Sequence, residues 1–385
     1  MRPEHENFGR ARLLTWTLSR ALIASAAVSL LLTGCGHQPK TAVRESDALR
    51  ALAVRVDGRA GEDKFSGALL VAKDGRVRFS RAYGLADRKR RIRNTLPTRF
   101  RVGSMNKMFT AVAILQLVEV GKVRLTAPLG EYLPDYPNRE VAAKVTIHQL
   151  LTHTGGTGNI AFSDFLAHRK ELRTLADFVK RYGKRGLEFE PGSSWAYSSY
   201  GFLLLGVVIE KVTGQSYYDY VAQHVYVPAG MTRSGSLPES QAVADRSIGY
   251  TRRPGTTALV PNTDTLPYRG GSAGGGYSTV EDLGRFAHAL LNHKLLSPDT
   301  TGLLITGKAE ASSGPLGGRY AYGFEDARDA DGNGWVGHGG GALGMNGDLR
   351  IYPKSGYVVA VLANSDPPAA QRISEYLDPR LPTAR

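Results

Sequence analysis

The sequence has a single cysteine, Cys35, among 385 residues, so the chain cannot form an internal disulfide bond. It also lacks an apolar stretch of the roughly 20 residues that a membrane-spanning helix requires, since the mostly apolar stretch at 21–32 covers only twelve. An H-E-x-x-H sequence is absent, and the glycine cluster at 270–276 lacks the G-K-[ST] ending of a phosphate-binding loop. We therefore expect no metal and no cofactor.

Acidic residues are in deficit, because 35 Asp and Glu stand against 49 Lys and Arg, giving a formal net charge of +14. Such a charge raises the question of nucleic-acid binding. Much of the excess, however, lies in the first fifty residues and in the basic run 88–93, which has no interleaved aromatic residues. We interpret that run as a solvated turn and expect no nucleic-acid partner. A general attraction to anionic lipid or cell-wall polymer stays open.

The N-terminus has the features of a secretory signal peptide. Four arginines precede the apolar stretch at 21–32, which ends in the sequence Leu32-Thr33-Gly34-Cys35. This ending resembles the bacterial lipobox, in which the cysteine becomes the lipidated first residue of the mature protein. We expect residues 1–34 to be removed, Cys35 to carry lipid, and residues 35–45 to act as a polar tether. The alternative is a cleaved peptide that ends near a cysteine by coincidence.

These features predict an exported lipoprotein that is anchored to the membrane and faces the periplasm. Gly36 follows the cysteine, where an Asp is often associated with retention at the inner membrane. In an organism with two membranes, the outer membrane is therefore favoured.

Strand patterns lie at both ends of the remaining chain, and helical patterns lie between them. A D-G turn joins the first two strand segments, and apolar residues recur at helical spacing over 104–119. The arrangement predicts an α/β fold that opens with paired antiparallel strands, in which one sheet is built from 46–105 and 265–385 and a mainly helical subdomain, 106–264, is inserted. The expected strands are 67–72, 76–83, 334–338, 348–352 and 357–362.

Ser104 and Lys107 form an S-x-x-K sequence at the start of the predicted helix, so their side chains project from the same face about one turn apart. A serine hydroxyl is a weak nucleophile until a base takes its proton, and a lysine in a desolvated position can be that base. An S-x-x-K sequence alone is weakly specific, because a chain of this length contains about one by chance.

Several blocks in sequence order resemble those of class C β-lactamases and of their esterase and D,D-peptidase relatives. Together they extend over about residues 65 to 365. The blocks are 82–87 continuing through 100–107, 150–156, 191–201, 271–279 and 337–341. The resemblance implies a β-lactamase/transpeptidase-like fold and a serine hydrolase that forms an acyl-enzyme on Ser104.

The resemblance also implies roles for further residues. Tyr197 corresponds to the family tyrosine that moves protons between the nucleophile, the lysine and the leaving group. His338 would line the site on a strand that continues through Gly340, and the N–H groups of Ser104 and Gly341 would form the oxyanion hole. From the residues alone, Tyr197 and His338 are equally compatible with structural roles. His153, in the block 150–156, we interpret as structural.

Two departures from the family pattern bear on the substrate. Ser199 replaces the asparagine of the Y-x-N motif, and His338 replaces a charged lysine, which weakens the case for β-lactams. An esterase or related acyl hydrolase is therefore the first expectation, acting on a small-molecule ester, lactam or peptide. The alternatives are a D,D-peptidase or β-lactamase acting on cell-wall peptides or β-lactams, and a non-catalytic lipoprotein that binds envelope peptides.

Overall fold

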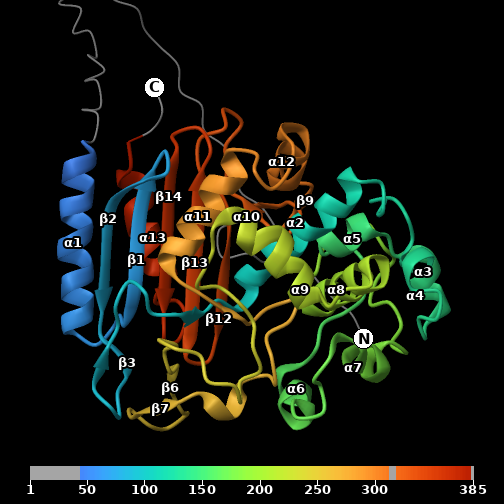
Figure 1. Ribbon diagram of the computed structural model, residues 1–385, viewed down its shortest axis with the longest axis horizontal. Coiled ribbons are helices and arrows are strands. Elements are labelled where there is room, and N and C mark those ends of the chain that lie inside the picture. The colour runs from blue at the N-terminus through green and yellow to red at the C-terminus, as the bar shows by residue number, and fades with distance from the viewer. Residues whose placement is uncertain (1–43, 312–317, 383–385) are drawn as a thin grey trace, which may run out of the picture. The chain divides into compact units, whose positions relative to one another are not determined.

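The computed structural model describes residues 44–311 and 318–382. Its centre is an antiparallel sheet of eight strands in the order β2-β1-β14-β13-β12-β11-β10-β9, so the two ends of the chain supply neighbouring strands (Figure 1). The strands are β1 (Gly67–Lys73), β2 (Arg76–Tyr83), β9 (Ala309–Glu310), β10 (Arg319–Tyr320), β11 (Glu325–Asp326), β12 (Val336–Ala342), β13 (Met345–Tyr352) and β14 (Tyr357–Ala363).

Strands β1 and β14 are buried on both faces because their alternate side chains enter different cores. Leu69 and Val71 pack toward α1 (Glu45–Gly61) and α13 (Gln371–Leu377), whereas Leu70 packs toward α11 (Val280–Leu291) and α2 (Asn106–Glu119). In Figure 1, α1 lies at the left of the sheet and α11 lies in front of it. This burial explains the continuous apolar run that forms β14.

The sequence predicts that the fold opens with paired strands, but the described part of the chain begins with the helix α1. The prediction is wrong on this point. The buried residues of α1, Ala48, Leu52 and Val56, recur every four positions, which is a helical signal. Glu45, expected to end the tether, is the first residue of α1.

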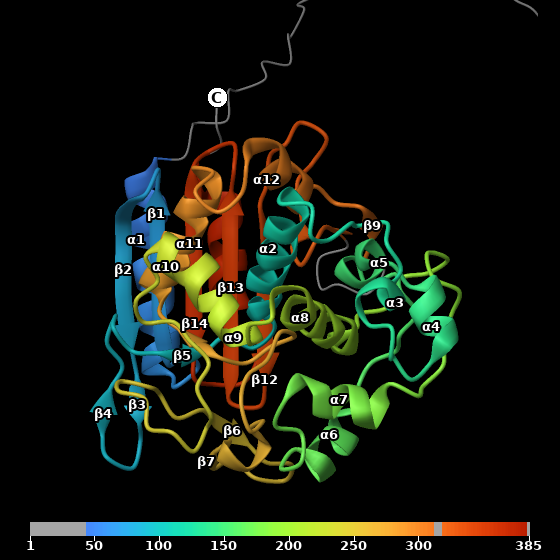
Figure 2. The same cartoon turned by 45° about the vertical axis from the view of Figure 1, so that its right-hand side comes forward.

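The segment between α2 and the late strands is mainly helical and lies beside the sheet (Figure 2). Thr174 caps α7 through a capping box with Asp177, and α8 ends at Gly214 in the left-handed conformation. Its helices are α3 (Leu129–Tyr132), α4 (Arg139–Lys144), α5 (Ile147–Leu151), α6 (Phe162–His168), α7 (Leu175–Tyr182), α8 (Ser199–Thr213), α9 (Tyr217–Val221) and α10 (Val227–Ala229).

Short strand pairs and one further helix complete the described part of the chain. The pairs are β3 (Leu85–Asp87) with β4 (Ile92–Arg93), β5 (Phe100–Arg101) with β8 (Tyr277–Ser278), and β6 (Tyr250–Arg252) with β7 (Leu259–Pro261), and the helix is α12 (Pro298–Ile305). The third pair lies inside 106–264, so that segment is not helical throughout.

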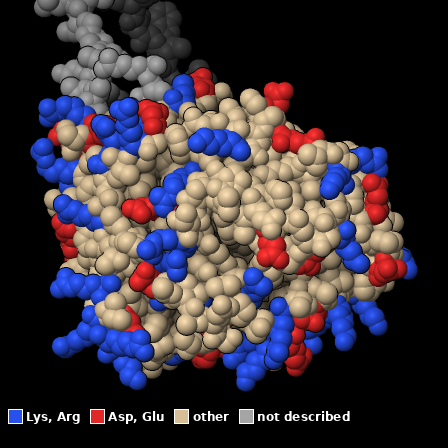
Figure 3. All heavy atoms as spheres, in the orientation of Figure 1, with Lys and Arg blue, Asp and Glu red and all other residues tan. Residues whose placement is uncertain are grey.

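Basic side chains gather at the edge of the molecule occupied by α1, β2 and β3, while the middle of the same face is largely uncharged (Figure 3). The basic run 88–93 forms the exposed turn of the β3–β4 pair and its flanks. Of the helices in the described ranges, none combines the length and the apolar character that crossing a membrane requires. Cys35 and residues 1–34 lie outside the described part of the chain.

Candidate active site

Ser104 lies in a 3-10 turn, Gly103–Met105, that precedes α2, and not in the first α-helical turn that the sequence predicts. Gly103 has a φ of +55°, which favours glycine, and a Cβ atom there would lie 3.1 Å from the backbone nitrogen of Gly341. The turn therefore places the Ser104 backbone directly beside β12. Met105 and Met108 are fully buried and anchor this turn and the start of α2 in the core.

The side chain of Lys107 is completely buried beside Ser104. Its Nζ lies 3.4 Å from Ser104 Oγ and 3.3 Å from Ser199 Oγ, and it donates to the carbonyl oxygen of Ala273. Burial lowers the pKa of Lys107 to about 7. No carboxylate within the described ranges forms an ion pair with it. A neutral amine has two N–H groups and one lone pair, which suit Ala273, Ser199 and the hydroxyl of Ser104 respectively.

The loop that carries Ala273 is held by two polar side chains of α2. Asn106 Nδ2 donates to the carbonyl oxygen of Gly271 at 2.6 Å, and Thr110 Oγ1 donates to that of Ser272 at 2.7 Å. Tyr217 contacts both side chains through its hydroxyl. The helix that carries Lys107 thus also fixes the glycine-rich loop that supplies its acceptor.

The glycine-rich loop contains a second serine, Ser272, which lies in a sequence pattern known for nucleophilic serines. Residues 270–274 match the G-x-S-x-G pattern of α/β-hydrolases, in which a serine is exposed on a strand-to-helix turn. Ser272, however, is fully buried, and its hydroxyl has no hydrogen-bond partner within the described ranges. It is therefore inaccessible to a substrate.

Tyr197 lies between Lys107 and His153. Lys107 Nζ is 4.8 Å from the centroid of the tyrosine ring, and the His153 ring lies 4.4 Å away on a tilted contact. Burial raises the pKa of Tyr197 far above that of free tyrosine, and a hydrogen bond with Ser104 opposes this only in part. The side chain is therefore a phenol near neutral pH, suited to donating a proton.

His153 supports this tyrosine structurally. It adopts a positive φ of 62°, and its Nδ1 accepts the N–H of Ser198 at 3.1 Å, which fixes the residue before Ser199 at the start of α8. Burial first, then the nearby Lys107, lowers its pKa well below the ordinary value. A neutral ring that packs against Tyr197 agrees with the structural interpretation of this residue.

His338 lies on β12, and the structure indicates one tautomer. Nε2 lies 3.0 Å from the hydroxyl of Tyr320, and Nδ1 contacts the carbonyl oxygen of Gly339, so Nδ1 carries the proton and Nε2 accepts. Burial, with a smaller contribution from Lys107, lowers the pKa of His338 to about 3. The residue is therefore neutral across the usual pH range and does not replace the charge of a lysine.

Gly340 and Gly341 bring β12 against the nucleophile turn. A Cβ atom on Gly340 would lie 2.0 Å from the carbonyl oxygen of Val102, so only glycine permits this approach. Gly341 follows, and its nitrogen lies 3.1 Å from the position of a Cβ atom on Gly103, so its N–H and that of Ser104 are the candidate oxyanion donors.

We expect Gly340→Ala to lower kcat/KM by about 100-fold, because displacing β12 moves one oxyanion donor. The matched control is Gly339→Ala, whose Cβ would lie 3.1 Å from the flexible end of Gln371 and at ordinary contact distance, 3.7 Å, from its next neighbours, and which should cost a few-fold at most. Steady-state ester hydrolysis measures both variants. Equal effects from the two substitutions would contradict this account of β12.

Ser199 begins α8 with its hydroxyl on Lys107, and its N–H donates to Asn159 Oδ1 at 3.1 Å. The sequence prediction missed Asn159, because it lies in a loop forty positions earlier and only folding brings it here. Its carboxamide stands beside the position from which the family asparagine is missing.

Two cavities meet at Ser104. The first, which we call the Tyr197 cavity, has a volume of about 300 Å³ and also contains His338, Gly340 and Glu325 in its wall. The second, the Ser199 cavity, has about 290 Å³. Its wall is mainly apolar and includes Ile160, Phe162, Phe165, Leu172, Phe178 and Leu203. Gly341 lines both cavities, so the reacting carbonyl group has room on either side of the oxyanion donors.

Glu325 is a second residue that the sequence prediction missed. It follows the aromatic segment 320–324 on the short strand β11 and reaches the Tyr197 cavity. Burial and the nearby Asp348 raise its pKa to about 7, while the backbone N–H of Gly339 donates to it and acts in the opposite direction. An acidic residue that directly follows a buried aromatic segment is the signal that points to it.

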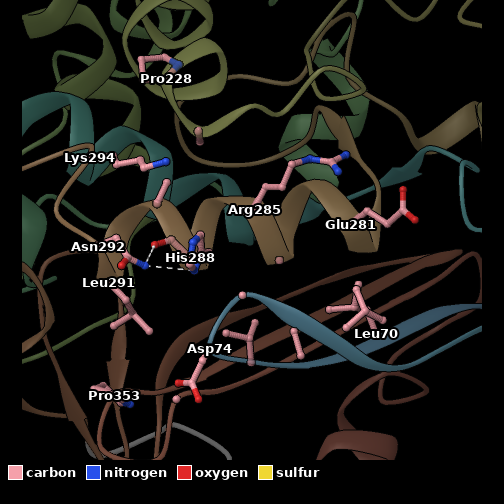
Figure 4. A pocket seen from close by; sticks show the side chains of 18 residues that line it. Leu70, Asp74, Pro228, Glu281, Arg285, His288, Leu291, Asn292, Lys294 and Pro353 are labelled. Carbon is pink, nitrogen blue, oxygen red and sulfur yellow. Dashed lines mark hydrogen bonds between the residues drawn. The ribbon is translucent and has the colours of Figure 1, made fainter.

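A larger cavity of about 610 Å³ lies between α11 and the β1–β2 turn, and neither Ser104 nor Lys107 lines it (Figure 4). Among its lining residues His288 bonds to Asn292, and Arg285 bonds to Asp282 outside the cavity wall, whereas Asp74, Glu281 and Lys294 form no ion pair within the described ranges. Within the described ranges, no group of three or more His, Cys, Asp or Glu side chains is placed to hold a metal ion.

A family profile described as Beta-lactamase matches residues 53–379. Penicillin-binding protein 4 of Amycolatopsis lactamdurans is 31% identical over 77% of this chain and 80% of its own length. The teichoic acid D-alanine hydrolase of Staphylococcus aureus is 27% identical over 70% of this chain and 64% of its own length. The crystal structure of a penicillin-binding protein from Bacillus halodurans superposes with a TM-score of 0.76 at 32% identity, covering 84% of this chain and 98% of that one.

The match extends over most of the chain, and the solved structure shares its fold. The site contains a serine, a buried lysine and a tyrosine in contact, next to the glycines of β12. The chain belongs to the beta-lactamase family of serine hydrolases.

Proposed function

We propose that this chain is an acyl-ester hydrolase that uses Ser104 as its nucleophile. The observation that carries the proposal is the fully buried Lys107, which contacts Ser104 without a carboxylate partner in the described ranges and has a pKa lowered to about 7 by burial. A lysine in this state is neutral often enough near pH 7 to take the serine proton.

In the proposed mechanism, Lys107 Nζ takes the proton of Ser104 while Oγ attacks the ester carbonyl carbon. The N–H groups of Ser104 and Gly341 stabilise the negative oxygen of the tetrahedral intermediate. Tyr197 donates its phenolic proton to the departing alkoxide, and the proton on Lys107 then returns to Tyr197. Water hydrolyses the acyl-enzyme with the same pair acting in reverse.

We assign the alcohol and acyl portions of the ester to different cavities. Tyr197 lines only the first, and the leaving oxygen must be within reach of its hydroxyl. We therefore place the alcohol portion in the Tyr197 cavity and the acyl portion in the apolar Ser199 cavity, where it gains about 25 cal/mol for each Å² of apolar surface buried.

An ester is favoured over a β-lactam because His338 carries no charge. A β-lactam presents a carboxylate, and a neutral imidazole at this position offers it no ionic partner. The second candidate is hydrolysis of D-amino-acid amides or peptides. Asn159 supports it by placing a carboxamide near Ser199.

The test compares a short-chain nitrophenyl ester with a chromogenic cephalosporin, each rate being divided by its uncatalysed rate. We expect the rate acceleration for the ester to exceed that for the cephalosporin by about tenfold to a hundredfold, the value of one lost charged hydrogen bond. A larger acceleration for the cephalosporin would replace the ester proposal with a lactamase. Turnover of neither, with turnover of D-alanyl amides, would favour the peptidase.

We also propose that the mature protein is a lipoprotein that begins at Cys35, is anchored to the membrane and faces the periplasm, and that it resides in the outer membrane if the organism has two. The support is the lipobox-like sequence that ends at this cysteine, after an apolar stretch too short to span a bilayer. The mass of the N-terminal peptide isolated from membranes tests this, because an unmodified Cys35 would exclude it.

A further inference from the structure

We propose that the Tyr197 cavity binds an ammonium group on the alcohol portion of the substrate, with the carboxylate of Glu325 as its ionic partner. The inference rests on the proposed ester hydrolysis and names the substrate class within it: esters of amino alcohols. It rests on the observation that Glu325 lines this cavity and forms no ion pair within the described ranges.

Two charged side chains besides Glu325 line the cavity, Arg319 and Asp326, and each is already engaged. Arg319 donates to the carbonyl oxygen of Gly307 and lies 3.6 Å from Glu310, at the outer end of the sheet. Asp326 forms an ion pair of 2.7 Å with Arg328. Glu325 forms no ion pair within the described ranges, and it faces the space next to Ser104.

The segment 312–317, which follows β9, has the sequence S-S-G-P-L-G and so contains no charged side chain. On the sheet behind Glu325, Arg350 is held by Asp348 at 2.9 Å and by Asp378. Two carboxylates therefore surround that arginine, which forms no ion pair with Glu325 and lowers the pKa of Glu325 less than burial and Asp348 raise it. The remaining charge in the cavity is negative.

The other walls also suit a cation. Gln371 Oε1 is a buried acceptor with no hydrogen-bond partner in the described ranges. Trp195 and Tyr320 present aromatic rings whose centroids are 6.1 Å apart, and such faces attract ammonium groups. His338 is uncharged and does not repel one. Burial raises the pKa of Glu325 to about 7, and an adjacent cation would favour its ionised form.

The experiment uses a matched pair of thioesters and the full-length protein in detergent. Acetylthiocholine carries a permanent positive charge on its leaving group, and 3,3-dimethylbutyl thioacetate is its uncharged counterpart of the same shape. Thiol release gives kcat/KM for both at pH 8, where Glu325 is mostly ionised. The wild-type protein should prefer the cationic thioester by about tenfold, as expected for one partly buried ion pair.

Glu325→Gln keeps the size of the side chain and an acceptor for the Gly339 N–H but removes the charge, so this preference should fall by about tenfold. The matched control is Glu375→Gln, which removes an exposed carboxylate on α13, one turn after Gln371, that forms no ion pair within the described ranges. It should leave the preference unchanged.

Three results overturn the inference: no wild-type preference, an equal preference in wild type and Glu325→Gln, or an equal loss in both variants, which would indicate a general field effect. Hydrolysis of the neutral thioester separates these from failure of the proposed function. If neither thioester is turned over in a Ser104-dependent manner, the ester proposal fails, and the cation site fails with it.

Discussion

Replacement of Ser104 by alanine is expected to abolish acyl-enzyme formation and to lower kcat for a nitrophenyl ester by at least about 10⁴-fold. Covalent catalysis divides the reaction into two steps that both need the Ser104 oxygen, and neither Lys107 nor Tyr197 can replace it as an acyl carrier. Stopped-flow release of nitrophenol measures the loss of the burst, and labelling with a fluorophosphonate followed by mass spectrometry measures the covalent adduct.

The matched control for this variant is Ser272→Ala, which removes the serine of the G-x-S-x-G sequence. Because Ser272 is buried and its hydroxyl has no partner in the described ranges, its removal should change kcat by no more than a few-fold. A burst that persists in Ser104→Ala and disappears in Ser272→Ala would move the nucleophile to the glycine-rich loop.

Replacement of Lys107 by methionine should lower kcat by about 10³-fold, within the range for loss of a general base. Methionine has nearly the same length and no charge, so it suits the fully buried position, and the variant should unfold at the same temperature as wild type or higher. Calorimetry provides that check. A fall in melting temperature that accompanied the loss of activity would indicate a structural role for the amine.

The pH dependence of the wild-type rate follows from the same residue. Only neutral Lys107 can accept the serine proton, so kcat/KM should rise with pH through a midpoint of about 7, the lowered pKa of Lys107, and fall about tenfold for each pH unit below it. His338, with a pKa of about 3, stays neutral throughout and does not contribute to this rise of kcat/KM with pH. The residual activity of Lys107→Met should not show this rise with pH. Survival of the rise in that variant would mean that another group titrates.

Local sequence patterns predicted most of the fold that positions the site. The apolar runs of β1 and β14 are long enough to be recognised because both of their faces are buried, and the caps of α7 and α8 rest on contacts within a few residues. The helix α1 was missed although its apolar spacing was present. Ser104 lies in a 3-10 turn because Gly103 turns the backbone toward β12, a long-range contact that helical periodicity does not register.

By itself, the sequence determined the family and the candidate site residues, because ordered motifs survive as short strings around Ser104, Tyr197 and His338. Their chemical states depended on tertiary structure. Burial makes Lys107 a base and keeps His338 neutral, and burial is a property of everything packed around them. Asn159 and Glu325 likewise became site residues only when distant segments met at the two cavities. Contacts across so much of the chain have no fixed spacing in sequence, so only the folded structure decides them.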